Sequence, residues 1–139
     1  MTLLLDTNVM SELRKGSRCH PNVARWFRTV DDVEIHTSVV VLGELKRGIE
    51  RVRPTDPVFA RELERWLTRL IASMGRRILP VDQAIALAWG LLSAPRTVPP
   101  IDGLLAATAI VHGYTIVTRN VKDMTGLGVR CLNPFEPAR

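Results

Sequence analysis

The feature that most constrains the fold is the alternation of very short apolar runs with longer helical patterns. Residues 3–5 are three leucines that end at Asp6, and residues 115–118 read Thr-Ile-Val-Thr. Runs this short predict buried strands, because a helix cannot begin and end within them. We expect further strands over residues 33–36, 77–81 and 129–132.

Amphipathic or apolar helical patterns fill the chain between these runs. The expected helices cover residues 8–13, 21–30, 39–51, 58–74, 85–92, 101–112 and 121–124. Thr37 or Ser38 can cap the third of them, and Asp82 the fifth. Strands that alternate with helices predict a mainly parallel sheet with helices on both faces, and therefore an α/β fold over residues 1–139 as one domain.

The bulk properties agree with one such domain. The chain has 139 residues, of which 46% are hydrophobic and 5% aromatic, so aliphatic side chains must fill the core. No apolar run approaches the ~18 residues that span a bilayer, and the opening MTLLLDTN lacks the basic flank of a signal peptide. We therefore expect a cytoplasmic protein, outside the membrane, in which Cys19 and Cys131 are free thiols.

The net charge is +5, from 19 basic and 14 acidic residues. A basic balance favours polyanionic partners such as nucleic acid. Charge alone is explained equally well by a solvated basic surface.

Acidic residues stand where a parallel sheet places its ligands. Asp6 follows the strand over 3–5, and Asn120 and Asp123 follow the strand over 115–118. Ligands of open parallel sheets lie beyond the carboxyl ends of the strands. Glu44 lies on a helix face otherwise suited to burial, and Asp102 opens an apolar, alanine-rich helix where a carboxylate needs a partner.

Each acid also has a structural interpretation, as a helix cap, a turn residue or a surface ion pair. Asp6 and Asp102 could each cap a helix, Asp123 could be a turn residue, and Glu44 could pair with Lys46 or Arg47 at the surface. Together the four acids suggest more, since carboxylates in one pocket repel each other and a bound cation removes that cost. Oxygen ligands suit Mg²⁺ or Mn²⁺ rather than zinc, and such an ion can activate a water for attack on phosphorus.

Four sequence blocks around these acids carry a family resemblance. LLLDTNVMSEL, SVVVLGELKRG, IDGLLAATAIVHG and TIVTRNVKDM occur in this order and span nearly the whole chain. They resemble PIN-domain proteins, particularly VapC-type toxins of the FitB-like group. One small departure is Met124, where many relatives have phenylalanine.

The resemblance implies a three-layer α/β/α PIN domain and an endoribonuclease that depends on Mg²⁺ or Mn²⁺. It implies that Asp6, Glu44, Asp102 and Asp123 form the catalytic metal site, with supporting polar roles for Asn8, Thr118 and Asn120. It also implies an RNA substrate, a homodimer, and a VapB-like antitoxin that blocks the site in a heterotetramer or larger complex. The basic residues expected to hold RNA phosphates are Arg14, Lys15, Lys46, Arg47 and Arg119.

Other functions remain open at this level. A phosphatase of the haloacid dehalogenase type would need an aspartate at position 8, and Asn8 cannot serve as a general acid. A non-catalytic RNA- or protein-binding module would be expected to lack one of the acids. A PIN-fold nuclease that acts on DNA, or in RNA processing without an antitoxin, is a further alternative. The apolar stripe over residues 58–74 fits a dimer or antitoxin surface as well as it fits the core.

Overall fold

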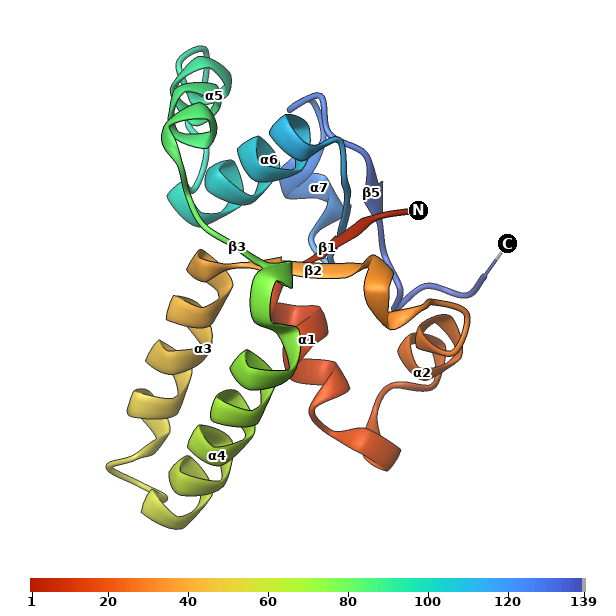
Figure 1. Cartoon of the computed structure of the whole chain (residues 1–139), viewed down its shortest axis with the longest axis vertical. Coiled ribbons are helices and arrows are strands. Elements are labelled where there is room, and N and C mark those ends of the chain that lie inside the picture. Colours follow the sequence, from red (N-terminus) through yellow and green to blue (C-terminus); the bar gives the residue numbers. More distant parts are fainter. Residues whose placement is uncertain (139) are drawn as a thin grey trace.

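A computed structural model describes residues 1–138 and contains a five-stranded parallel sheet (Figure 1). The strand order is β3-β2-β1-β4-β5, and every neighbouring pair is parallel. The strands are β1 (Leu3–Leu5), β2 (Ile35–Ser38), β3 (Ile78–Leu79), β4 (Thr115–Val117) and β5 (Cys131–Leu132). The α/β class predicted from the alternation is therefore confirmed.

Within residues 1–138, seven α-helices cover the two faces of the sheet and complete three layers. They are α1 (Thr7–Leu13), α2 (Pro21–Phe27), α3 (Val39–Val52), α4 (Pro57–Met74), α5 (Gln83–Ser93), α6 (Pro100–His112) and α7 (Val121–Met124). Figure 1 shows α1 to α4 on one side of the sheet and α5 to α7 on the other. Three 3₁₀ turns, η1 (Gly16–Arg18), η2 (Asp32–Glu34) and η3 (Gly75–Arg77), join these elements.

The central strand explains the opening run of leucines. β1 lies between β2 and β4, and Leu4 and Leu5 are completely buried. A central parallel strand is covered on both faces, so both of its side-chain directions must be apolar. In the neighbouring strands Ile116 and Val117 are equally buried, and Thr37 donates its hydroxyl to the Leu5 carbonyl at 2.9 Å.

The second strand begins two residues later than predicted. Val33 lies in η2, not in a strand, and its side chain is 77% exposed. A capping box between Asp31 and Glu34 stabilises this turn before β2 begins at Ile35. The sequence expectation was wrong here because Val33 was read as part of the apolar run that follows it.

Other boundaries differ in detail from the prediction. α2 ends at Phe27 rather than near residue 30. Just beyond this end, the Thr29 hydroxyl donates a hydrogen bond to the Trp26 carbonyl. Ser38, and not Thr37, caps α3 by accepting a hydrogen bond from the Val40 amide at 3.2 Å. These corrections move no acid away from its strand end.

Two further expectations concern cysteines and the membrane. Cys19 and Cys131 are free thiols, as predicted, and burial raises the pKa of both. Within residues 1–138, no helix combines the length and apolar character needed to cross a bilayer.

Candidate active site

Asp6 lies at the end of β1 with its carboxylate held on both oxygens. Its side chain is only 4% exposed. Oδ1 accepts a hydrogen bond from the Thr7 amide at 2.7 Å, and Oδ2 accepts one from the Thr118 hydroxyl at 2.8 Å. Burial raises the pKa of Asp6, while these two hydrogen bonds act in the opposite direction. Asp6 also caps α1, so the capping interpretation is correct but describes only one of its oxygens.

Two of the three predicted supporting side chains, those of Thr118 and Asn8, meet beside Asp6, whereas Asn120 contributes its backbone amide. The Thr118 hydroxyl accepts a hydrogen bond from the Asn120 amide at 3.0 Å and lies 3.4 Å from the donating Asn8 side-chain nitrogen. The Asn8 side-chain oxygen in turn accepts from the Arg119 amide at 3.0 Å. These contacts join the start of α1 to the end of β4 and fix the hydroxyl that holds Asp6.

Glu44 reaches the same region from α3. Its Oε1 accepts a hydrogen bond from the Thr7 hydroxyl at 2.6 Å, and Oε2 lies 3.7 Å from the Arg47 guanidinium. Thr7 therefore contacts two of the acids, through its amide and its hydroxyl. The sequence alone does not single out Thr7, although its position between Asp6 and Asn8 is a usable signal.

Asp102 lies in the first turn of α6 but does not cap it. The N-cap position belongs to Pro99, so the capping interpretation is wrong. Within residues 1–138, no group donates a hydrogen bond to the Asp102 carboxylate. Burial, followed by the charges of Asp6, Asp123 and Glu44, raises its pKa to about 6. The four acids are therefore close enough to repel one another.

Asp123 occupies the first turn of the short helix α7, beyond the end of β4. Its charge raises the pKa of both Asp6 and Asp102. Its amide bonds the Asn120 carbonyl at 3.1 Å, which is the turn geometry that the alternative interpretation expected. A position in a turn and a position in the acid cluster are thus compatible.

The acid cluster is open rather than closed. Across residues 1–138, no three aspartate, glutamate, histidine or cysteine side chains are gathered tightly enough to hold a metal directly. The donor set is composed of carboxylate and hydroxyl oxygens, and among residues 1–138 the one basic side chain in contact with it is Arg47. This chemistry suits a hard cation that keeps part of its water shell.

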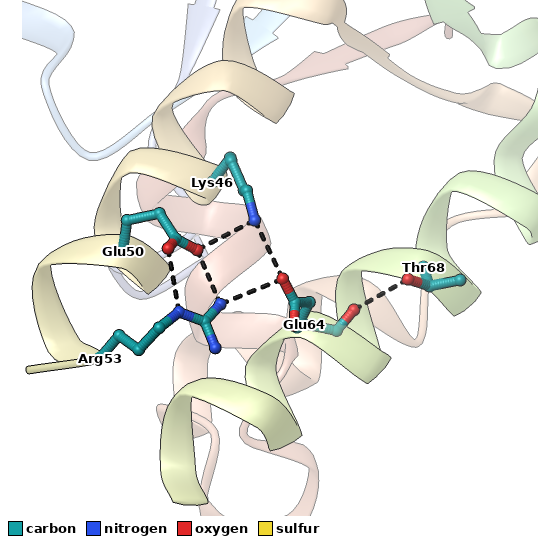
Figure 2. A network of polar contacts seen from close by, with 5 residues as sticks. All are labelled: Lys46, Glu50, Arg53, Glu64 and Thr68. Carbon is teal, nitrogen blue, oxygen red and sulfur yellow. Dashed lines mark hydrogen bonds and ion pairs between the residues drawn. The ribbon is translucent and has the colours of Figure 1, made fainter. Parts of the chain in front are cut away.

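The predicted basic residues have different surroundings. Figure 2 shows Lys46 on α3 between Glu50 and Glu64, and its Nζ donates to both at 2.9 Å. Arg53 bridges the same two carboxylates at 2.7 and 3.0 Å, so the cluster ties α3 to α4. Lys46 is consequently a weaker candidate for RNA contact than its sequence position suggested.

Lys15, Arg14 and Arg119 make two kinds of contact, an ion pair and cation–aromatic contacts. Lys15 pairs with Glu12 at 3.1 Å. The guanidinium carbon of Arg14 lies 5.5 Å from the centre of the Phe59 ring. That of Arg119 lies 4.0 Å from the centre of the Phe135 ring. Among residues 1–138, no carboxylate pairs with the guanidinium of Arg14 or Arg119.

An apolar groove begins at the acid cluster and runs between α1, α3 and α4. Its volume is about 280 Å³, and it extends from Thr7 and Glu44 to Phe59, Leu63 and Trp66. The stripe on α4 therefore contributes both to the core, through its buried members, and to this groove. The sequence could not separate the two uses.

The fold and the positions of the acids define the class of protein. The PIN domain family model matches residues 3–122, and the chain belongs to this family. The resemblance noted from the four sequence blocks is thereby confirmed.

Individual relatives are similar over nearly their whole length. The chain is 29% identical to a VapC ribonuclease of Sinorhizobium fredii, with 98% of this chain and 99% of the relative covered. It is also 29% identical to the toxin FitB of Neisseria gonorrhoeae, with 96% and 98% covered. The crystal structure of FitAcB from Neisseria gonorrhoeae superposes with a TM-score of 0.78 at 27% identity, over 96% of this chain and 99% of that one.

Proposed function

We propose that this chain is a Mg²⁺- or Mn²⁺-dependent endoribonuclease toxin that a VapB-like antitoxin inhibits. The observation that carries the proposal is the position of Asp102 beside three other carboxylates: burial, followed by the charges of Asp6, Asp123 and Glu44, raises its pKa to about 6. Four carboxylates with so little cationic compensation create a strong local demand for a cation. The names of the VapC and FitB relatives support ribonuclease and toxin as the activity and role.

In this proposal Asp6, Glu44 and Asp102 hold the principal ion, and Asp123 holds a second ion or orients the attacking water. When bound, the ion would supply a water of lowered pKa and charge stabilisation at the phosphate. Donors that are all oxygen atoms suit Mg²⁺, which usually keeps several of its waters.

The chain's own hydrogen bonds give Asp6 and Glu44 fixed orientations. Thr118 and the Thr7 amide occupy one lone pair on each oxygen of Asp6, and the Thr7 hydroxyl fixes Oε1 of Glu44. Such outer contacts typically change metal affinity or activity about 10- to 100-fold when they are removed. The same two hydrogen bonds to Asp6 oppose the rise in its pKa that burial causes.

The test compares matched RNA and DNA oligonucleotides with Mg²⁺, Mn²⁺ or EDTA. We expect cleavage of RNA only, and only with a divalent ion. A preference for DNA would favour the alternative PIN nuclease. Intact RNA in every condition, combined with tight RNA binding and no heat of Mn²⁺ binding, would favour a non-catalytic binding module.

We place the antitoxin segment in the apolar groove between α1, α3 and α4, because this groove leads directly to Glu44 and Thr7. A helix or extended segment seated there would cover the acid cluster. Co-expression with the small reading frame next to the gene should yield an inactive complex. Leu63→Glu should weaken that complex and restore cleavage, whereas Val33→Glu, at an exposed site in η2 outside the groove and outside α5, should leave the complex intact.

The proposed homodimer would use α5. This helix has no charged residue, and Leu87 and Leu91 are 67% and 80% exposed. A contiguous exposed apolar surface of this kind marks an interaction site. Light scattering should give a dimer for the wild type at micromolar concentration and a monomer for Leu91→Glu; a monomeric wild type would contradict this assignment.

A further inference from the structure

Three segments that are distant in the sequence meet around Arg119. The Arg119 amide bonds Asn8 at the start of α1, and the guanidinium lies over Phe135 in the segment after β5. In a parallel sheet, residues that follow β4 and β5 lie at the carboxyl ends of the strands, as does Asp6, which follows β1. Arg119 therefore stands on the β5 side of the acid cluster, directly after the threonine that holds Asp6.

Phe135 is itself fixed by several contacts. Its side chain is only 9% exposed. Its carbonyl accepts a hydrogen bond from the Asn22 side chain at 2.8 Å, and its amide donates to the Asn133 side chain at 3.0 Å. The His20 ring meets it edge to face, with the ring centres 5.6 Å apart. The aromatic face beneath Arg119 is thus part of the packed structure.

The stacking has a consequence for what Arg119 can bind. A guanidinium over an aromatic face is attracted by the ring quadrupole, yet its N–H donors radiate in its own plane and remain available. Within residues 1–138, no carboxylate pairs with this guanidinium. An arginine whose orientation is set before binding loses less entropy when it forms two parallel hydrogen bonds to a phosphate.

We propose that Arg119, held over the ring of Phe135, is a preformed binding site for a backbone phosphate of single-stranded RNA next to the acid cluster. Arg119 contacts the phosphate, and Phe135 acts as a positioning residue through Arg119. This inference rests on the proposed ribonuclease function, because it names the part of the site that would hold the substrate backbone.

The other basic candidates lack this combination. Lys15 and Lys46 are paired with carboxylates, and Arg47 lies beside Glu44. Arg14 is farther from its aromatic partner, at 5.5 Å from the Phe59 ring centre. Arg119 alone among the five predicted residues joins a close aromatic contact to a hydrogen bond with the Asn8 network.

The experiment measures RNA binding separately from cleavage. Binding of a short, fluorescein-labelled single-stranded RNA is followed by anisotropy in EDTA over a series of salt concentrations. The variants are Arg119→Gln, Arg119→Lys, Phe135→Leu, Phe135→Tyr and the Arg119→Gln/Phe135→Leu double variant. Arg76→Gln is the matched control, because Arg76 is exposed in η3 before β3, at the opposite edge of the sheet.

The salt dependence of RNA binding should distinguish the charge of Arg119 from the positioning of Arg119 by Phe135. Arg119→Gln should bind about tenfold more weakly, and the slope of log affinity against log salt should fall by about 0.7 because one phosphate contact is lost. Phe135→Leu should bind about threefold more weakly with the slope unchanged, since the charge remains. Phe135→Tyr should restore wild-type binding, and Arg119→Lys should keep the slope while losing affinity.

The double variant tests the link between the two residues. It should bind like Arg119→Gln alone, because Phe135 acts only through the arginine. Equal binding by wild type, Arg119→Gln and Arg76→Gln would overturn the inference, as would independent losses in the double variant. If Phe135→Leu does not fold, as judged by circular dichroism, RNA binding by the single Arg119 variants and by Phe135→Tyr tests the proposal. RNA cleavage with Mn²⁺ is measured in parallel, and its absence in the wild type would count against the proposed function without altering the binding result.

Discussion

Replacing Asp102 by asparagine should stabilise the metal-free protein. The pKa of Asp102 is raised from 3.8 to about 6, first by burial and then by the three other acids. Asparagine has nearly the same shape and carries no charge. The variant therefore removes the repulsion and leaves the packing of α6 in place.

The expected magnitude follows from that pKa. The difference between 3.8 and about 6 corresponds to about 3 kcal/mol against the ionised form in the folded state, at about 1.4 kcal/mol for each pH unit. Asp102 is only partly buried, so solvent screening reduces the effect to about 1–1.5 kcal/mol. In a chain of this length that is a rise in Tm of about 4–6 °C at pH 8.

The sign depends on pH. Because Asp102 binds its proton more tightly in the folded state than in the unfolded chain, its contribution to wild-type stability falls as pH rises from 3.8 through about 6. The advantage of Asp102→Asn should consequently be larger at pH 8 than at pH 5. Added Mn²⁺ should reverse the ranking, since it stabilises the wild type by about 2.7 kcal/mol at 100 times its Kd and the variant by less.

Thermal unfolding in EDTA, at pH 5 and pH 8, measures these differences. Asp82→Asn is the matched control, because Asp82 caps α5 by accepting from the Ile85 amide at 2.9 Å and asparagine caps about as well. Its Tm should stay within about 1 °C of the wild type. A Tm of Asp102→Asn equal to or below that of the wild type at pH 8 would refute the idea of mutual repulsion.

Three further substitutions test the surroundings of the site. Thr118→Val removes the hydroxyl that donates a hydrogen bond to Asp6. It should lower the free energy of unfolding, measured with urea, by about 1.5–3 kcal/mol, and it should lower RNA cleavage about tenfold. Unchanged cleavage would remove Thr118 from the site. Gly103→Ala would place its Cβ 2.9 Å from Cδ1 of Trp89, and it should destabilise by about 1–3 kcal/mol. In Gly43→Ala the new Cβ meets nothing within 4 Å, so this helical substitution should stabilise by up to about 1 kcal/mol, and equal effects at both glycines would contradict the packing argument.

The sequence predicted the sheet edge well because its signals are local. Three leucines followed by Asp6 predict both a buried strand and the residue at which it ends. The same holds for β4 and Thr118. Parallel pairing then brings these ends together without any knowledge of side-chain contacts. Glu44 and Asp102 depended on the family resemblance, since their own helices allow other interpretations.

Contacts between distant residues were not predictable in this way. No local pattern links Thr7 to Glu44, or Arg119 to Phe135, because each contact depends on how a helix or tail returns to the sheet. The start of β2 was misplaced for a different reason. The capping box from Asp31 competes with the apolar character of Val33 and prevails.

Cleavage of one purified RNA by the wild type and by Asp6→Asn, each with Mn²⁺ and with EDTA, tests the central claim most directly. Asp6 is the most firmly held of the four acids, with a hydrogen bond on each oxygen. We expect metal-dependent cleavage by the wild type, none above background by Asp6→Asn, and wild-type cleavage by the Asp82→Asn control. Equal cleavage by wild type and Asp6→Asn, or cleavage that persists in EDTA, would contradict a metal-dependent acid site.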